Sequence, residues 1–97
     1  MGMITSRIPL PPKGIWHGRK HHKLKTLTNF YQDVERGKKK FEVRFNDRDF
    51  KVGDIVCLQE FIPPSTYTGR EIRKEVGYIL DDLDYCKEGF VVLGLKD

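Results

Sequence analysis

Alternating apolar and polar residues run along most of the chain after residue 20, and this pattern predicts a protein built mainly from β-strands. Side chains along a strand point to opposite faces in turn, so alternation gives one buried and one exposed face. A near-continuous apolar run at 55–62 instead predicts a central strand. The expected strands are His21–Leu27, Lys39–Asn46, a short return at Phe50–Val52, Ile55–Ile62, Arg70–Leu80 and Gly89–Lys96.

One segment breaks the alternation with a helical spacing. Phe30 and Val34 are four residues apart and fall on one face of a predicted helix. Thr28 or Asn29 can accept hydrogen bonds from the first free amides, and Gly37 can take the left-handed conformation that ends a helix. One early helix with five to six strands predicts an α+β fold, in which a small curved sheet closes toward a barrel and the helix covers one end.

The expected core takes alternate residues from the strands together with the apolar face of the helix. Its expected members are Phe30, Val34, Phe41, Val43, Phe45, Val56, Leu58, Val76, Tyr78, Val91 and Leu93. On this interpretation the polar residues between Phe41 and Phe45 lie on the outer face of their strand.

Charge divides the 97-residue chain unevenly. The net charge is +4, but residues 1–27 hold six basic residues and no acidic one, whereas the remaining 70 residues hold 12 basic and 14 acidic. We expect a basic, Pro/Gly-rich arm over 1–20 and one domain over 21–97. A basic arm is common in proteins that contact polyanions, and a solvated leader segment is the simpler alternative.

No apolar run approaches the length of a membrane span, so we expect a cytoplasmic protein, monomeric and with no membrane partner. Cys57 and Cys86 lack a C-x-x-C spacing and are expected to be free thiols. His17, His21 and His22 lie among lysines and lack a fourth ligand at a convincing spacing, which argues against a metal site. No cofactor-binding motif occurs, and we expect no cofactor.

The strongest chemical signal lies at the entrance to the second strand. Glu42 and Arg44 share one strand face, with Lys39 just upstream. Arginine can grip a phosphate through two parallel hydrogen bonds, and glutamate can accept from a base or act as a general base. An internal salt bridge from Glu42 to Arg44 or Lys39 is the structural alternative. Lys38, Lys40 and Arg48 extend the basic cluster, although cations after a helix also stabilise its dipole.

Gly37, Lys39, Glu42 and Arg44 form the pattern G-x-K-x-x-E-x-R, which resembles the signature of the ASCH domain, a small relative of the PUA barrel. The resemblance covers about residues 22–97 and is to a group of small bacterial and phage domains of unassigned function. It implies a PUA-like small mixed β-barrel of five to six strands with one helix near the N-terminus. It also implies that the motif side chains line a cleft that binds RNA or a nucleotide.

Three functions follow from these residues. The first is an RNA- or nucleotide-binding module that uses Lys38, Lys39, Lys40, Glu42, Arg44 and Arg48. The second is a small hydrolase acting on RNA or an N4-acylated nucleoside, with Lys39 and Glu42 as catalytic residues. Relatives that remove acyl groups from such nucleosides carry a threonine where Glu42 stands, so that nucleophile is absent. The third is a protein-interaction domain, for which the acidic loop Asp81–Asp84 is the most suggestive feature.

Overall fold

The structure, a computed structural model, describes residues 18–97. Most of the basic arm expected over 1–20 therefore lies outside the described residues, and its role stays a prediction. The elements in chain order are β1 (His21–Leu27), α2 (Thr28–Glu35), β2 (Phe41–Phe45), β3 (Ile55–Ile62), β4 (Thr66–Leu80) and β5 (Phe90–Lys96). The α+β class is confirmed, and the predicted bounds of β1 and β3 are correct. In residues 18–97 no helix is both long and apolar enough to cross a membrane.

The five strands form one mixed sheet in the order β1-β3-β4-β5-β2. β1 pairs with β3 in parallel, and the other three pairings are antiparallel. The hydrogen-bonded sheet is open, with β1 and β2 as its two edges. The short return strand expected at Phe50–Val52 is absent, and Phe50 instead anchors a turn through its buried ring.

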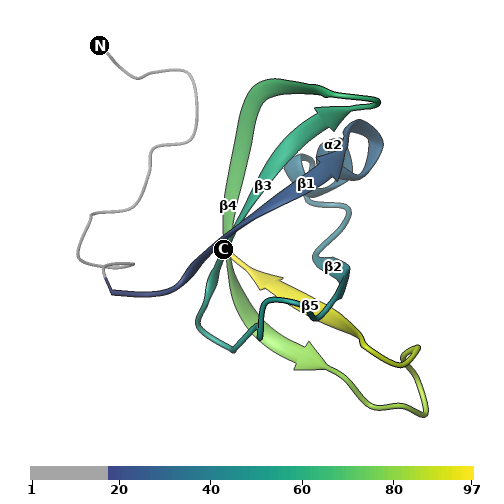
Figure 1. Ribbon diagram of the computed structural model, residues 1–97. Coiled ribbons are helices and arrows are strands. Elements are labelled where there is room, and N and C mark those ends of the chain that lie inside the picture. The colour runs from purple at the N-terminus through teal and green to yellow at the C-terminus, as the bar shows by residue number, and fades with distance from the viewer. Residues whose placement is uncertain (1–17) are drawn as a thin grey trace.

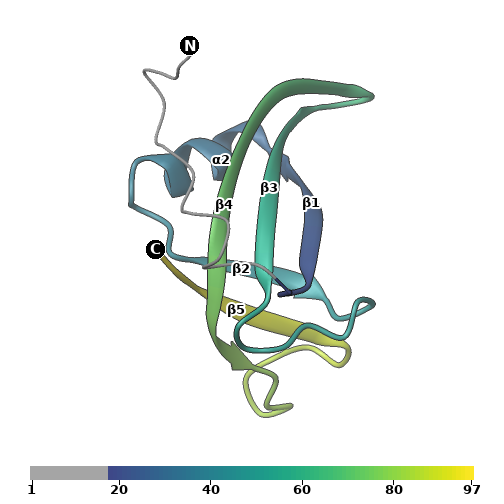
Figure 2. The same cartoon turned by 90° about the vertical axis from the view of Figure 1, so that its left-hand side faces the viewer.

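The long strand β4 bends the sheet. Its first part pairs with β3 and its last part pairs with β5. The two parts of β4 therefore belong to two portions of the sheet that run in different directions. Figures 1 and 2 show β2 and β5 crossing beneath the other strands, while α2 lies beside the far ends of β1 and β3. The curvature brings the two edge strands toward each other. This approach creates the region described below as the site.

The core lies on the concave face of the sheet under α2. Six expected members are buried there: Val34, Val56, Leu58, Val76, Val91 and Leu93. Leu24 and Tyr31 complete the contact between β1, α2 and the sheet. Helix α2 begins at Thr28 without a side-chain cap, so the capping prediction is wrong. It ends as expected before Gly37, whose φ of 77° is left-handed.

Five expected core residues are exposed instead: Phe30, Phe41, Val43, Phe45 and Tyr78. In β2 the prediction chose the wrong face, because alternation identifies two faces without saying which one is buried. The buried face carries Glu42 and Arg44, whose charges compensate each other. In β4 a bulge between Val76 and Tyr78 reverses the alternation, so Val76 is buried and Tyr78 is not.

The two cysteines are expected to react at very different rates. Cys57 is buried in β3, and its burial raises the pKa of the thiol to about 11, whereas Cys86 is partly exposed in the β4–β5 loop. Because the thiolate is the nucleophile, an aromatic disulfide reagent at neutral pH should label Cys86 quickly and Cys57 only upon unfolding. Two equally fast labelling phases in the native protein would contradict the buried position of Cys57.

Candidate functional site

Glu42 lies at the centre of three charged side chains. It is 3% exposed, and its carboxylate accepts hydrogen bonds from Nζ of Lys39 and from Nε and Nη2 of Arg44. The two bonds from Arg44 measure 3.1 and 2.8 Å. The internal salt bridge left open by the sequence is therefore present, with both cations engaged. The prediction that Glu42 lies on the exposed face of β2 is wrong.

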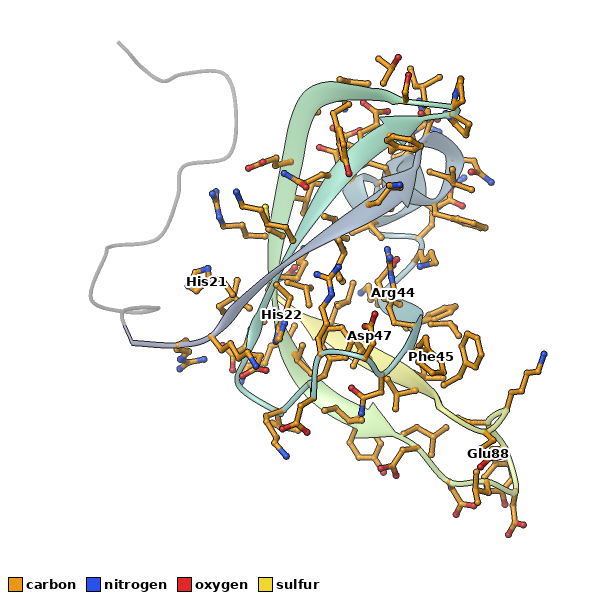
Figure 3. The ribbon with its side chains drawn as sticks, in the orientation of Figure 1. His21, His22, Arg44, Phe45, Asp47 and Glu88 are labelled. Carbon is orange, nitrogen blue, oxygen red and sulfur yellow. The ribbon has the colours of Figure 1, made fainter. Side chains whose placement is uncertain are left out.

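Arg44 also connects β2 to the opposite edge of the sheet. Its Nη2 donates to the carbonyl of Lys25 at 2.9 Å and to the hydroxyl of Thr26 at 3.2 Å. Thr26 is buried and donates in turn to the carbonyl of Leu24. Figure 3 shows Arg44 and Phe45 leaving β2 in different directions, as neighbours on a strand must. The guanidinium of Arg44 thus binds Glu42 and also donates a hydrogen bond to a backbone carbonyl on the free edge of β1.

Arg48 makes a second bridge of this kind just after β2. Its Nη1 donates to the carbonyl of Lys23 on β1. Lys20 donates back to the carbonyl of Arg48 at 3.4 Å. Side-chain hydrogen bonds from arginines therefore join β1 to the β2 segment, where a closed sheet would have a backbone ladder.

These contacts collect positive charge along the boundary between β1 and the β2 segment. We call this group of basic residues the basic seam, and its members are Lys20, Lys23, Lys25, Lys39, Arg44 and Arg48. Lys23 and Lys25 take part in these contacts through their backbone carbonyls, and their side chains are exposed. Lys38 and Lys40 are exposed where α2 passes into β2 and extend the seam at that end. Among the carboxylates near the seam, Glu42 is buried, Oδ1 of Asp47 lies 3.8 Å from Nε of Arg48, and Glu71 is close enough to interact electrostatically with Lys23. The binding role of each basic residue stays a prediction.

A shallow apolar hollow of about 450 Å³ lies beside this region, between the start of α2 and the ends of β1 and β3. Its lining includes Leu27, Phe61 and Pro63, but none of Lys39, Glu42 or Arg44. The motif side chains therefore do not line this hollow, and they meet at the seam instead. Lys25 lies over the ring of Phe61, 4.4 Å from its centroid, and connects the rim of the hollow to the seam.

A second buried carboxylate, Glu60 on β3, was not anticipated. It accepts a hydrogen bond from the hydroxyl of Thr68 at 2.8 Å and lies 3.8 Å from Nη1 of Arg70. Arg70 also pairs with Glu35 on α2 and lies over the ring of Tyr31. Burial raises the pKa of Tyr31, although the positive charge of Arg70 opposes the shift. A glutamate within an apolar run was the signal that could have identified this cluster.

His22 has a structural role in the described part of the chain. Its Nε2 lies 2.8 Å from a carboxylate oxygen of Asp54, and its ring packs on Phe50 with centroids 4.7 Å apart. Asp54 also accepts from the backbone amide of Lys51. This buried pair fixes the turn that precedes β3. His17, the third member of the histidine cluster, lies outside the described residues.

Comparison with known proteins places the chain in a family. Residues 21–95 match the family model described as Domain of unknown function (DUF3850). The chain is also 31% identical over 74 residues to the "Uncharacterized 12.9 kDa protein in GpA 3'region" of Escherichia phage P2. That match covers 76% of this chain and 66% of the phage protein. The chain therefore belongs to the family described as Domain of unknown function (DUF3850).

Proposed function

We propose that this protein is an RNA- or nucleotide-binding module and that its basic seam contacts phosphate groups. The observation that carries the proposal is the meeting of basic residues from both edge strands at one boundary. Arg44 and Arg48 donate to the backbone carbonyls of Lys25 and Lys23, so these four basic residues are neighbours across the boundary between the two edge strands. The side chains of Lys23 and Lys25 themselves lie on the exposed face of β1. Lysine and arginine that neutralise phosphates supply most of the affinity for nucleic acid, largely independent of sequence.

Glu42 contributes by holding two of these cations in place. Its carboxylate accepts hydrogen bonds from Lys39 and Arg44 and so restricts both side chains before a ligand arrives. Less side-chain entropy of these two residues is then lost when a ligand binds. Within residues 18–97, the hydrogen bonds of Arg44 use Nε and Nη2, which leaves Nη1 for a phosphate oxygen. A planar guanidinium with a fixed orientation is well suited to this contact.

The hydrolase alternative uses Lys39 and Glu42 as an acid/base pair, and these side chains are in contact. Both oxygens of Glu42, however, accept hydrogen bonds from cations. That arrangement suits a carboxylate that positions its neighbours. We therefore favour the binding module, in which Glu42 is a positioning residue.

We also propose that the fold is an ASCH-type, PUA-like barrel whose closure between β1 and β2 is made by side chains. Support comes from the G-x-K-x-x-E-x-R pattern at 37–44 and from the single early helix. The bridges from Arg44 and Arg48 lie where the last ladder of such a barrel would run. Fold alone does not define a ligand, so the binding proposal rests on the seam.

Neutralising two seam lysines is expected to weaken RNA binding and reduce its salt dependence. Lys23→Gln with Lys25→Gln removes two exposed cations of β1. For single-stranded RNA, the slope of log affinity against log salt should become shallower by about 0.7 for each phosphate that the variant no longer neutralises. Fluorescence anisotropy with labelled single-stranded RNA over a range of salt concentrations measures both effects.

The matched control carries Lys51→Gln and Lys74→Gln, which remove two lysines outside the seam that pair with Asp49 and Asp97. The control should keep the wild-type slope. Equal reductions in both double variants would show that binding depends on overall charge, and the seam proposal would be wrong. Failure of the wild type to bind single-stranded RNA, transfer RNA or free nucleotides at low salt would remove the binding function itself.

A further inference from the structure

The convex face of the sheet exposes two aromatic rings on either side of a glycine. Phe41 on β2 and Tyr78 on β4 both pair with Gly94 on the intervening strand β5. Residues paired across antiparallel strands point to the same face, so both rings flank the position where Gly94 lacks a side chain. Phe41 is 45% exposed and Tyr78 is 67% exposed. We call these three residues the aromatic slot, meaning two exposed aromatic residues with the backbone of Gly94 between them.

The dimensions of the slot suit a flat ring. Its walls are two strand spacings apart, which is about 9–10 Å at the backbone. Stacked aromatic rings have centroids at least about 4.5 Å apart, so one ring fits between the two walls. A Cβ at Gly94 would lie 3.3 Å from the Cβ of Tyr78, so a side chain there would crowd the floor.

A local irregularity places Tyr78 in this slot. Regular alternation from Val76 would send Tyr78 to the buried face, but the register shifts between these two residues, with Gly77 between them. Such bulges re-aim side chains and are over-represented next to functional sites. The exposed position of Tyr78 is thus a consequence of backbone geometry.

Cations lie beside the rings. Nζ of Lys39 is 4.9 Å from the ring centroid of Phe41 and also belongs to the basic seam. Lys96 follows Gly94 by two residues on the same strand, so its side chain leaves the same face, where its exposed Nζ lies 3.6 Å from Oε2 of Glu75. Aromatic walls next to ammonium groups complement a ligand that joins a flat ring to an anion. Nucleotides within a single strand have this chemistry.

We propose that one base of single-stranded RNA stacks between Phe41 and Tyr78 over Gly94, with its phosphates directed toward Lys39 and Lys96. This inference rests on the proposed RNA-binding function and names the form of RNA bound. Stacking needs an unpaired base, so the slot selects single strands over duplexes. Every base has a flat face, so the slot accepts all four bases.

The test compares Tyr78→Leu and Phe41→Leu with Tyr85→Leu, which removes a tyrosine that is 79% exposed in the β4–β5 loop, outside the slot. Anisotropy with labelled oligouridine and oligoadenosine of about ten nucleotides should show that each slot variant loses about 5- to 150-fold in affinity. Tyr85→Leu should bind as the wild type does. An oligomer of abasic sugar-phosphate should bind to all four proteins equally, since it has no base to stack.

The outcomes separate the two proposals. If slot variants bind oligonucleotides as the wild type does, while Lys23→Gln with Lys25→Gln binds less, the slot inference is wrong and the seam stands. Slot variants that turn a wild-type dimer into a monomer in sedimentation, with unchanged RNA affinity, would assign the face to a second copy of the chain. A weaker affinity of Tyr78→Leu for the abasic oligomer would also contradict stacking. A wild type that binds no RNA overturns both.

Discussion

Replacing Arg44 with leucine is expected to lower the free energy of unfolding by about 2–4 kcal/mol. The change leaves the buried carboxylate of Glu42 with Lys39 as its remaining cation and removes the bridge to the Lys25 carbonyl. Removing one partner of a buried ion pair typically costs about 3–5 kcal/mol, and partial solvent exposure of Arg44 reduces that figure. Urea denaturation followed by circular dichroism measures the difference.

Two further variants test whether the cost of Arg44→Leu comes from the buried carboxylate of Glu42. Arg73→Leu removes an arginine on β4 whose carboxylate partner, Glu71, is 3.6 Å away and partly exposed, so it should cost under about 1 kcal/mol. Glu42→Leu combined with Arg44→Leu should recover part of the stability lost in Arg44→Leu, because the buried carboxylate is removed and the partly exposed Lys39 keeps its hydrogen bond to the Phe41 carbonyl. A double variant less stable than Arg44→Leu would contradict this account of the ion pair.

The second large effect concerns which face of each strand is buried. Leu58→Ala is expected to cost about 2–5 kcal/mol, because Leu58 is 0% exposed and lies within the core cluster. Phe41→Ala removes a larger side chain, but this ring is nearly half exposed, so its cost should be smaller. Thermal and urea unfolding of the two variants provide the comparison. A greater destabilisation by Phe41→Ala than by Leu58→Ala would show that Phe41 belongs to the core, as the sequence pattern predicts.

The order and type of most elements could be predicted from sequence because hydrophobic periodicity is a local property. The β3 run 55–62 and the helix stop at Gly37 each depend on neighbouring residues alone. The buried face of β2 could not be predicted, since it depends on whether Glu42 meets Lys39 and Arg44 in three dimensions. A charged residue is excluded from a core only when it lacks such partners.

Only the local part of the site could be predicted from sequence, because its other contacts join distant parts of the chain. Sequence spacing places Glu42 and Arg44 on one strand face, but the bridge from Arg44 to Lys25 joins edges that are far apart in the sheet order. The exposure of Tyr78 depends on the register shift before it, which alternation does not reveal. Long-range register and sheet curvature therefore determine which residues assemble at the seam and the slot.

The pairing order of the strands has a consequence for synthesis and folding. Both edge strands are made early, yet β1 needs β3 as its partner and β2 needs β5, the last strand along the chain. A ribosome that has released only β1, α2 and β2 has produced no two strands that pair with each other. Such non-local topology slows folding, since loop entropy is lost before contacts compensate. The motif segment must therefore remain without its ladder until nearly the whole domain has been synthesised, which makes the seam one of the last features to form.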